Sequence, residues 1–173
     1  DALKEDGVTL EDTDYYVDVR HILIKPVGDT EDAKTFTDAQ WEACRQQAQA
    51  ILDQWLKEGG GEDGFAALAE EKSQDDGSKY VGGLYENVAQ GKMVAEFNDW
   101  IFDEARQIGD YGLVKTTYGY HVMYFVGSTP EWYVVCENAL LKKASNELLE
   151  TLLAEAKVET DYASIFLGEA NLG

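Results

Sequence analysis

The chain contains two histidines, His21 and His121, and both fall in segments whose residues alternate like those of β-strands. An imidazole can gain or lose a proton near physiological pH, so these side chains are the first candidates for chemistry. Each shares the apolar face of its strand with residues at two-residue spacing: Val17, Val19 and Leu23 in the first, Met123 and Phe125 in the second. One histidine in such a position is usually a hydrogen-bonded core residue, but two on one predicted sheet favour a shared site.

The segments around these histidines predict the elements that position them. The first strand covers residues 15–24 and is closed by Pro26 and Gly28. Thr37 followed by Gln40 is a capping-box pattern and begins a long helix, which ends at Gly59. Apolar residues recur along this helix at three- and four-residue spacing: Trp41, Cys44, Ala48, Ile51, Leu52, Trp55 and Leu56.

The next part of the chain alternates short helices and strands. The pattern predicts, in order, a helix over 65–72, a loop over 73–83 and a strand over 84–88. An amphipathic helix follows, which begins at Met93, carries its apolar residues as far as Phe102 and ends near Gly109. Strands over 112–117 and 120–126 are joined by a tight turn at Tyr118–Gly119. This order predicts an α+β domain over residues 14–128.

Two flanking segments lie outside this domain. Residues 1–13 are acidic and mostly unpatterned, and we interpret them as an N-terminal leader. Beyond Thr129–Pro130, residues 129–173 predict a long helix followed by a short strand over 162–167. Five residues of the helix recur at four-residue spacing and give it a wide apolar face: Cys136, Leu140, Ala144, Leu148 and Leu152.

Charge and composition limit the classes of partner. The chain has 34 Asp and Glu against 14 Lys and Arg, a formal net charge of -20. Such a surface repels a phosphate backbone, so nucleic acid is a poor candidate partner. No apolar run is long enough to span a bilayer or to form a signal peptide, and position 1 is not Met, so we interpret the chain as an excerpt that meets a membrane only through a segment absent from it. Cys44 and Cys136 can be a disulfide pair or two buried thiols, and buried thiols are the default expectation.

Four groups of residues, in order along 14–128, resemble the parvulin family of peptidyl-prolyl cis/trans isomerases. They are Val19-Arg20-His21-Ile22-Leu23, similar to the family's first strand; Ala67-Leu68-Ala69 leading to Ser73-Gln74-Asp75, Asp76-Gly77-Ser78 and Gly82-Gly83, similar to its helix, catalytic loop and paired glycines; Gly91-Lys92-Met93-Val94-Ala95-Glu96-Phe97, similar to its proline-pocket segment; and Tyr118-Gly119-Tyr120-His121-Val122, similar to its final hairpin. The resemblance implies an antiparallel sheet of about four strands wrapped by about four helices, with a C-terminal helical extension.

The resemblance also implies roles for individual residues. His21 and His121 match the family's histidine pair, Thr116 a hydroxyl of the same hydrogen-bond network, and Asp75 its acidic position, with Asp76 as the substitute if the loop alignment shifts by one. The proline pocket is matched by Met93 and Phe97, with Phe102 behind them, and by Leu84 or Tyr85. The last choice stays open because the family's usual Gly-Gly-Asp-Leu-Gly is replaced here by Gly82-Gly83-Leu84-Tyr85-Glu86. No cofactor or metal is implied.

The implied function is cis/trans isomerisation of X–Pro bonds in unfolded or secreted polypeptides. Amide resonance creates a rotation barrier of about 18–20 kcal/mol, and a catalyst can lower it by binding the twisted amide better than either planar form, without a covalent intermediate. Specificity for phosphorylated substrates is not expected, because the loop over 25–38 holds Lys25 and Lys34 among four acidic residues. Likeness to PrsA-like and SurA-like foldases implies an extracytoplasmic setting.

Two other functions remain open from the sequence. In the first, the domain is a chaperone or binding module with little isomerase activity, and the C-terminal helix belongs to a chaperone lobe, as it does in those foldases. In the second, less favoured, His21, His121 and Asp75 ligate zinc, although no HExxH or similar motif is present.

Overall fold

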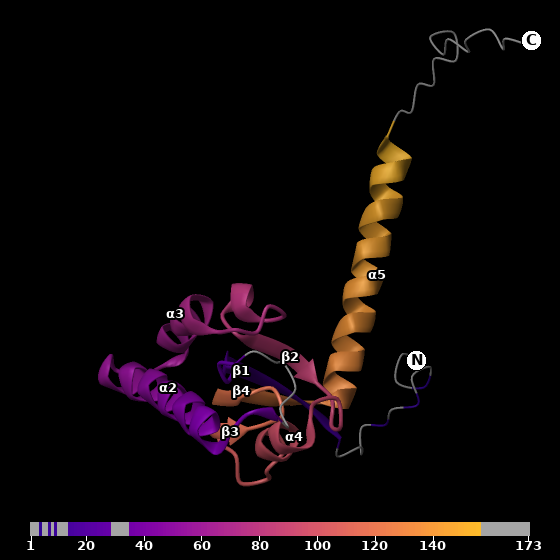
Figure 1. The fold of residues 1–173 in the computed structure, drawn as a ribbon. Coiled ribbons are helices and arrows are strands. Elements are labelled where there is room, and N and C mark those ends of the chain that lie inside the picture. Colours follow the sequence, from indigo (N-terminus) through magenta and orange to yellow (C-terminus); the bar gives the residue numbers. More distant parts are fainter. Residues whose placement is uncertain (1–3, 5–6, 8, 10–13, 29–34, 157–173) are drawn as a thin grey trace, which may run out of the picture.

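A four-stranded antiparallel sheet with the order β2-β1-β4-β3 forms the centre of the computed structural model (Figure 1). The structure describes residues 4, 7, 9, 14–28 and 35–156. The strands are β1 (Tyr15–Ile24), β2 (Leu84–Val88), β3 (Tyr111–Lys115) and β4 (Tyr120–Pro130), and the helices are α2 (Asp38–Lys57), α3 (Glu62–Lys72), α4 (Ala95–Ile101) and α5 (Glu131–Glu155), with a 3-10 turn, η2, at Lys79–Val81. The predicted α+β class is confirmed.

The two central strands, β1 and β4, bury both of their faces. On one face, Ile22 and Val122 pack with α2 and α3 in a core that includes Trp55 and Phe65. On the other face, Val19 and Met123 pack with α4 in a second core, as do the following residues: Val17, Val88, Phe97, Ile101, Val114 and Phe125. Because side chains alternate along a strand, His21 and His121 share the face that carries the second core, as the sequence predicts.

Helix α2 begins as its sequence predicts. The Thr37 hydroxyl accepts a hydrogen bond from the Gln40 backbone N–H, and the Gln40 side chain accepts one from the Thr37 N–H, which completes the capping box. Its buried residues lie three or four positions apart, so the helix turns one stripe toward the sheet: Cys44, Ala48, Ile51, Leu52 and Trp55. The predicted helix over 65–72 begins three residues earlier, at Glu62.

The helix predicted to begin at Met93 and to end near Gly109 is shorter at both ends. Helix α4 covers only Ala95–Ile101, because its N-cap, Val94, has an extended backbone with ψ 151°. Met93 therefore lies in the connection before the helix, although it packs against the same core as Phe97. Apolar residues at helical spacing can continue across a helix end when the connecting segment also packs on the core.

Strand β4 is longer than predicted and leads directly into α5. It pairs with β1 as far as Tyr15 and Pro130, four residues beyond the expected end at Val126. Helix α5 then extends away from the sheet (Figure 1), and six of its leucines are largely exposed: Leu140, Leu141, Leu148, Leu149, Leu152 and Leu153. Both cysteines are free, Cys44 buried and Cys136 half-buried, so the expectation of two buried thiols is right only for Cys44. The predicted strand over 162–167 and most of the leader lie outside the described residues.

Gly83 sets how closely the loop after α3 approaches β1. Its φ is +72°, and a Cβ at this position would overlap the carbonyl oxygen of His21 and lie 2.9 Å from the Cβ of Ala69. Its own carbonyl accepts a hydrogen bond from the His21 N–H at 2.9 Å. Only glycine combines this backbone conformation with this approach, so Gly83 fixes the loop beside His21.

We predict that Gly83→Ala lowers the free energy of unfolding by more than about 2 kcal/mol, because it adds steric overlap to backbone strain. The matched control is Gly91→Ala: Gly91 has a similar φ of +79°, but no atom lies within 4 Å of the position that a Cβ would take. Urea denaturation should show a loss of about 1 kcal/mol for Gly91→Ala. Equal losses for the two variants would contradict a steric role for Gly83.

Candidate active site

The two histidine rings contact each other across the β1–β4 pair. Leu23 is the strand partner of His121 and Met123 that of His21, so the two histidines are diagonal neighbours on one face. Their Nδ1 atoms are 3.0 Å apart and their ring centroids 5.1 Å apart. Both are buried, with exposures of 2% for His21 and 5% for His121. The sequence-based expectation that they form one site is consistent with this geometry.

The remaining ring nitrogens each have a partner. His121 Nε2 lies 2.9 Å from the hydroxyl of Thr116, at the end of β3, and His21 Nε2 lies 3.0 Å from Asp75 Oδ2. The Thr116 hydroxyl also accepts the backbone N–H of Tyr118 at 3.1 Å, so its proton is available to the imidazole. Four side chains from three separate parts of the sequence thus form one continuous hydrogen-bonded network.

This network admits one arrangement of protons when both rings are neutral. The carboxylate of Asp75 can only accept, so His21 Nε2 carries a proton and donates it. His21 Nδ1 is then an acceptor, and His121 Nδ1 must donate to it. His121 Nε2 in turn accepts from the Thr116 hydroxyl. Both nitrogens of each imidazole are then hydrogen-bonded, which explains how the two rings can be buried together.

The charge of the site is concentrated on Asp75. Its hydrogen bond with His21, and further ones from Ser78 and Tyr85, hold the pKa of this carboxyl well below its ordinary value. Burial, and to a smaller extent the neighbouring His21, lower the pKa of His121 to about 3. Burial and the carboxylate of Asp75 raise the pKa of Tyr85 to about 12. The site at neutral pH therefore holds an ionised Asp75, a neutral His121 and a protonated Tyr85.

Ser78 and the hydroxyl of Tyr85 complete the network, and the sequence did not predict that either would bond to Asp75. Ser78 is fully buried, donates to Asp75 Oδ2 and lies 3.0 Å from His21 Nε2. The Tyr85 hydroxyl donates to the same carboxylate oxygen at 2.9 Å. The sequence signal for Ser78 was its place in the loop segment Asp76-Gly77-Ser78. The structure brings Asp75 to the histidines, while the side chain of Asp76, the substitute, is exposed.

A cavity of about 430 Å³ opens above the histidine pair. His21, His121 and Asp75 line it, together with residues of predominantly apolar character: Leu23, Tyr85, Met93, Val94, Phe97 and Tyr118. The ring of Phe97 stands edge-on to both imidazoles, with centroid distances of 5.4 Å to each. Met93 and Phe97 thus line the same cavity as the histidines, and their role as a proline clamp stays a prediction.

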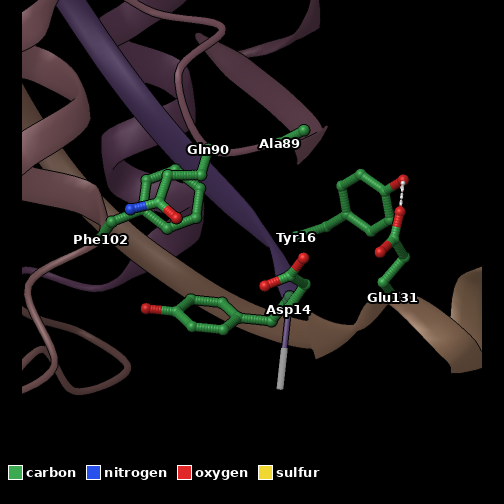
Figure 2. Close-up of a pocket in the computed structure, with 7 residues that line it drawn as sticks. Asp14, Tyr16, Ala89, Gln90, Phe102 and Glu131 are labelled. Atoms are coloured by element: carbon green, nitrogen blue, oxygen red, sulfur yellow. Dashed lines mark hydrogen bonds between the residues drawn. The ribbon is translucent and has the colours of Figure 1, made fainter. Parts of the chain in front are cut away.

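Two predicted pocket residues do not line this cavity. Leu84 is absent from its wall, whereas Tyr85 lines it and stacks on His21 with ring centroids 5.2 Å apart, which favours Tyr85 of the two candidates. Phe102 packs against Tyr15 and lines a different hollow of about 170 Å³. Figure 2 shows Phe102 there with Asp14, Tyr16, Gln90 and Glu131, near the start of β1 and the root of α5.

The zinc hypothesis finds no support in this arrangement. Among the described residues, no three His, Cys, Asp or Glu side chains are placed to hold one ion. The reason is visible at the histidines: the nitrogens of His21 are directed at Asp75 and His121, and those of His121 at His21 and Thr116. The donor atoms bond to one another instead of converging on a common point.

Comparison with known proteins identifies the family. A family model described as the PPIC-type PPIase domain matches residues 8–128. The chain belongs to the PPIC-type peptidyl-prolyl isomerase family. Among the relatives, foldase protein PrsA 1 of Listeria innocua is 29% identical over 159 residues, which are 90% of this chain and 47% of that protein. Foldase protein PrsA 3 of Bacillus cereus is 48% identical over 64 residues, 36% of this chain and 22% of that protein. The chain thus spans less than half the length of these relatives.

Solved PPIC-type structures show the same fold. A crystal structure of a PpiC-type peptidyl-prolyl cis-trans isomerase domain superposes with a TM-score of 0.52 at 20% identity, covering 68% of this chain and 94% of that one. PrsA from Bacillus subtilis superposes with a TM-score of 0.50 at 24% identity, covering 85% and 52% respectively. At these identities the likeness concerns the fold alone, and the α+β architecture of the PPIC-type domain is confirmed.

We predict that His121 stays neutral well below the pH at which histidine ordinarily titrates. Its pKa of about 3, against 6.5 for the free group, follows from burial beside His21. ¹⁵N NMR of the imidazoles should show the His121 ring neutral at pH 5. The same measurement on the urea-unfolded chain, where the ring should titrate normally, is the control.

The same shift makes stability depend on pH. Between about pH 6.5 and pH 3 the unfolded chain gains a proton at His121 that the folded chain excludes, so the free energy of unfolding falls as the pH falls. Urea denaturation of His121→Gln should show a shallower fall over this range. A folded-state midpoint near pH 6.5 for the His121 ring would contradict the lowered pKa.

Proposed function

We propose that the chain catalyses cis/trans isomerisation of X–Pro bonds in unfolded polypeptides. The observation that carries the proposal is the apolar cavity placed directly on a buried, internally satisfied pair of imidazoles. Membership of the PPIC-type family and the foldase names of its relatives support the same function. The cavity walls suit a proline ring, because Met93 and Phe97 offer apolar contact beside aromatic edges.

The catalytic effect follows from binding the twisted amide. Rotation about the prolyl bond breaks amide resonance, so the twisted state has less charge separation and loses less free energy on leaving water. A cavity that excludes water and holds the ring therefore favours the twisted state over both planar forms. No covalent step is needed.

The histidine chain acts in this proposal as the rigid floor of the site. His121 is neutral, and the carboxylate of Asp75 already accepts hydrogen bonds from His21, Ser78 and Tyr85. A carboxylate that is so occupied is a weak nucleophile and a weak base. We therefore assign His21, His121, Thr116 and Asp75 to shaping the cavity and fixing the electric field at the substrate carbonyl.

We predict that Met93→Ala reduces kcat/KM for an Ala-Pro peptide about tenfold, since it removes one wall of contact with the ring. NMR exchange spectroscopy of the cis and trans peptide signals measures this rate directly. Phe102→Leu is the matched comparison, because Phe102 belongs to the same core but lines the other hollow. It should stay within about threefold of the parent. If Phe102→Leu loses activity and Met93→Ala does not, the cavity assignment is wrong.

A second function is favoured by one observation on α5. This 25-residue helix has no buried residue, and its exposed leucines recur along much of its length. We propose that it contributes to binding unfolded clients, as a chaperone lobe next to the isomerase domain. Apolar surface of this kind can hold exposed apolar segments of other chains.

We predict that Leu148→Lys with Leu152→Lys weakens the suppression of aggregation of a reduced, unfolded client, because charge on this face opposes apolar contact. Light scattering measures the aggregation, and the isomerase rate of the same variant should be retained. Glu147→Gln with Glu150→Gln, on the same helix, changes the net charge equally and is the control. Equal losses in both double variants would show a charge effect instead of an apolar surface.

The setting of the protein is also a proposal. None of the described helices is long and apolar enough to cross a membrane. We propose an extracytoplasmic location from the foldase resemblance, which fractionation of the source cells with an antibody against the chain tests directly. The absence of phosphate specificity stays a prediction, because residues 29–34 of the loop concerned lie outside the described residues.

A further inference from the structure

Two lysines, Lys25 and Lys92, line the cavity above the histidines. Both are exposed, whereas His21 and Phe97 in the same cavity are buried, so the lysines lie at its mouth. Lys25 follows the end of β1, and Lys92 belongs to the segment between β2 and α4. Two separate elements therefore bring ammonium groups to one opening.

The charge at this mouth is opposite to that of the whole molecule. The chain has 34 acidic and 14 basic residues, yet the charged residues that line the cavity are Lys25, Lys92 and one acid, Asp75. Asp75 is half-buried and engaged by hydrogen bonds from Ser78 and Tyr85. Within the described ranges, neither lysine has a carboxylate at ion-pair distance, and their charges face the solvent at the cavity mouth.

We propose that this mouth selects prolines flanked by an acidic residue. The inference rests on the proposed isomerase function and adds the substrate class: Asp-Pro, Glu-Pro, Pro-Asp or Pro-Glu segments. A proline ring in the cavity places its two neighbours at the opening, one residue or about 3.8 Å away along the chain. An ammonium group attracts a carboxylate there, and the surrounding acidic surface makes the two lysines the local site of attraction.

Charge pairs at an exposed mouth have a modest effect. We expect the two lysines together to change kcat/KM about threefold to tenfold, with screening by salt. Lysine attracts either anion as a point charge, and carboxylate is the anionic side-chain group of unmodified polypeptides.

Two peptide series test the proposal. In one, the residue before proline in Ala-Xaa-Pro-Phe is Glu, Gln or Lys; in the other, the residue after proline is varied in the same way. NMR exchange spectroscopy gives kcat/KM and NMR titration gives Kd. In at least one series, Glu should exceed Gln and Gln exceed Lys, and the preference should diminish in about 0.5 M NaCl. Glu no better than Gln in both series overturns the proposal.

Charge-reversal variants assign the effect to these lysines. Lys25→Glu and Lys92→Glu should each shift the preference toward the Lys peptide, and the double variant should invert it. Lys57→Glu changes the net charge equally but lies at the exposed end of α2, away from the cavity, and should keep the preference for Glu. A shift as large in Lys57→Glu as in Lys25→Glu would assign the effect to net charge and overturn the proposal.

The outcomes separate this proposal from the function on which it rests. If no peptide is isomerised, the proposed isomerase function fails, while the Kd values of the Glu, Gln and Lys peptides still decide the acidic preference. A phosphoserine-proline peptide that exceeds Glu-Pro by more than about tenfold would overturn the carboxylate assignment in favour of phosphate.

Discussion

The hydrogen bond between the Nδ1 atoms of His21 and His121 constrains much of this molecule. It joins two buried rings at 3.0 Å, and it exists only if β1 and β4 keep their register. A shift of that pairing by one residue would turn one ring to the opposite face of the sheet. The outer atoms of the rings then need Thr116 and Asp75, because an unsatisfied buried nitrogen costs about 1–3 kcal/mol. The register of β1 and β4, the position of Thr116 after β3 and the position of the loop that carries Asp75 thus all depend on this interaction.

Backbone hydrogen bonds to β1 hold the loop between α3 and β2 in the position that this pair of rings requires. The Gln74 N–H donates to the Leu23 carbonyl, and the Gly83 carbonyl accepts from the His21 N–H, so both ends of the loop bond to β1. Asp75 and Ser78 lie between these two attachments and reach the imidazole from there. The loop is rich in turn formers, yet its position is determined by bonds to the central strand.

The two faces of the sheet differ in what they carry. The sheet face covered by α2 and α3 is an apolar core, while the face covered by α4 combines a core with the histidine chain and the cavity. The acidic surface, the cationic cavity mouth and the leucines of α5 lie outside these layers. The cavity and the exposed leucines of α5 can therefore be altered independently by substitution.

The sequence by itself determined the strand and helix order, the capping box at Thr37, the shared face of His21 and His121 and the family, because these depend on periodicity and local motifs. It did not determine whether Leu84 or Tyr85 faces the cavity, or where α4 begins. It also did not show that Phe102 lines a different pocket. Those depend on packing: Tyr85 reaches Asp75 and His21 only across the β1–β2 pair, and Val94 is extended where helical spacing continues through it. The tertiary structure alone decided the direction of each ring nitrogen, because hydrogen-bond partners distant in sequence meet only in the folded chain.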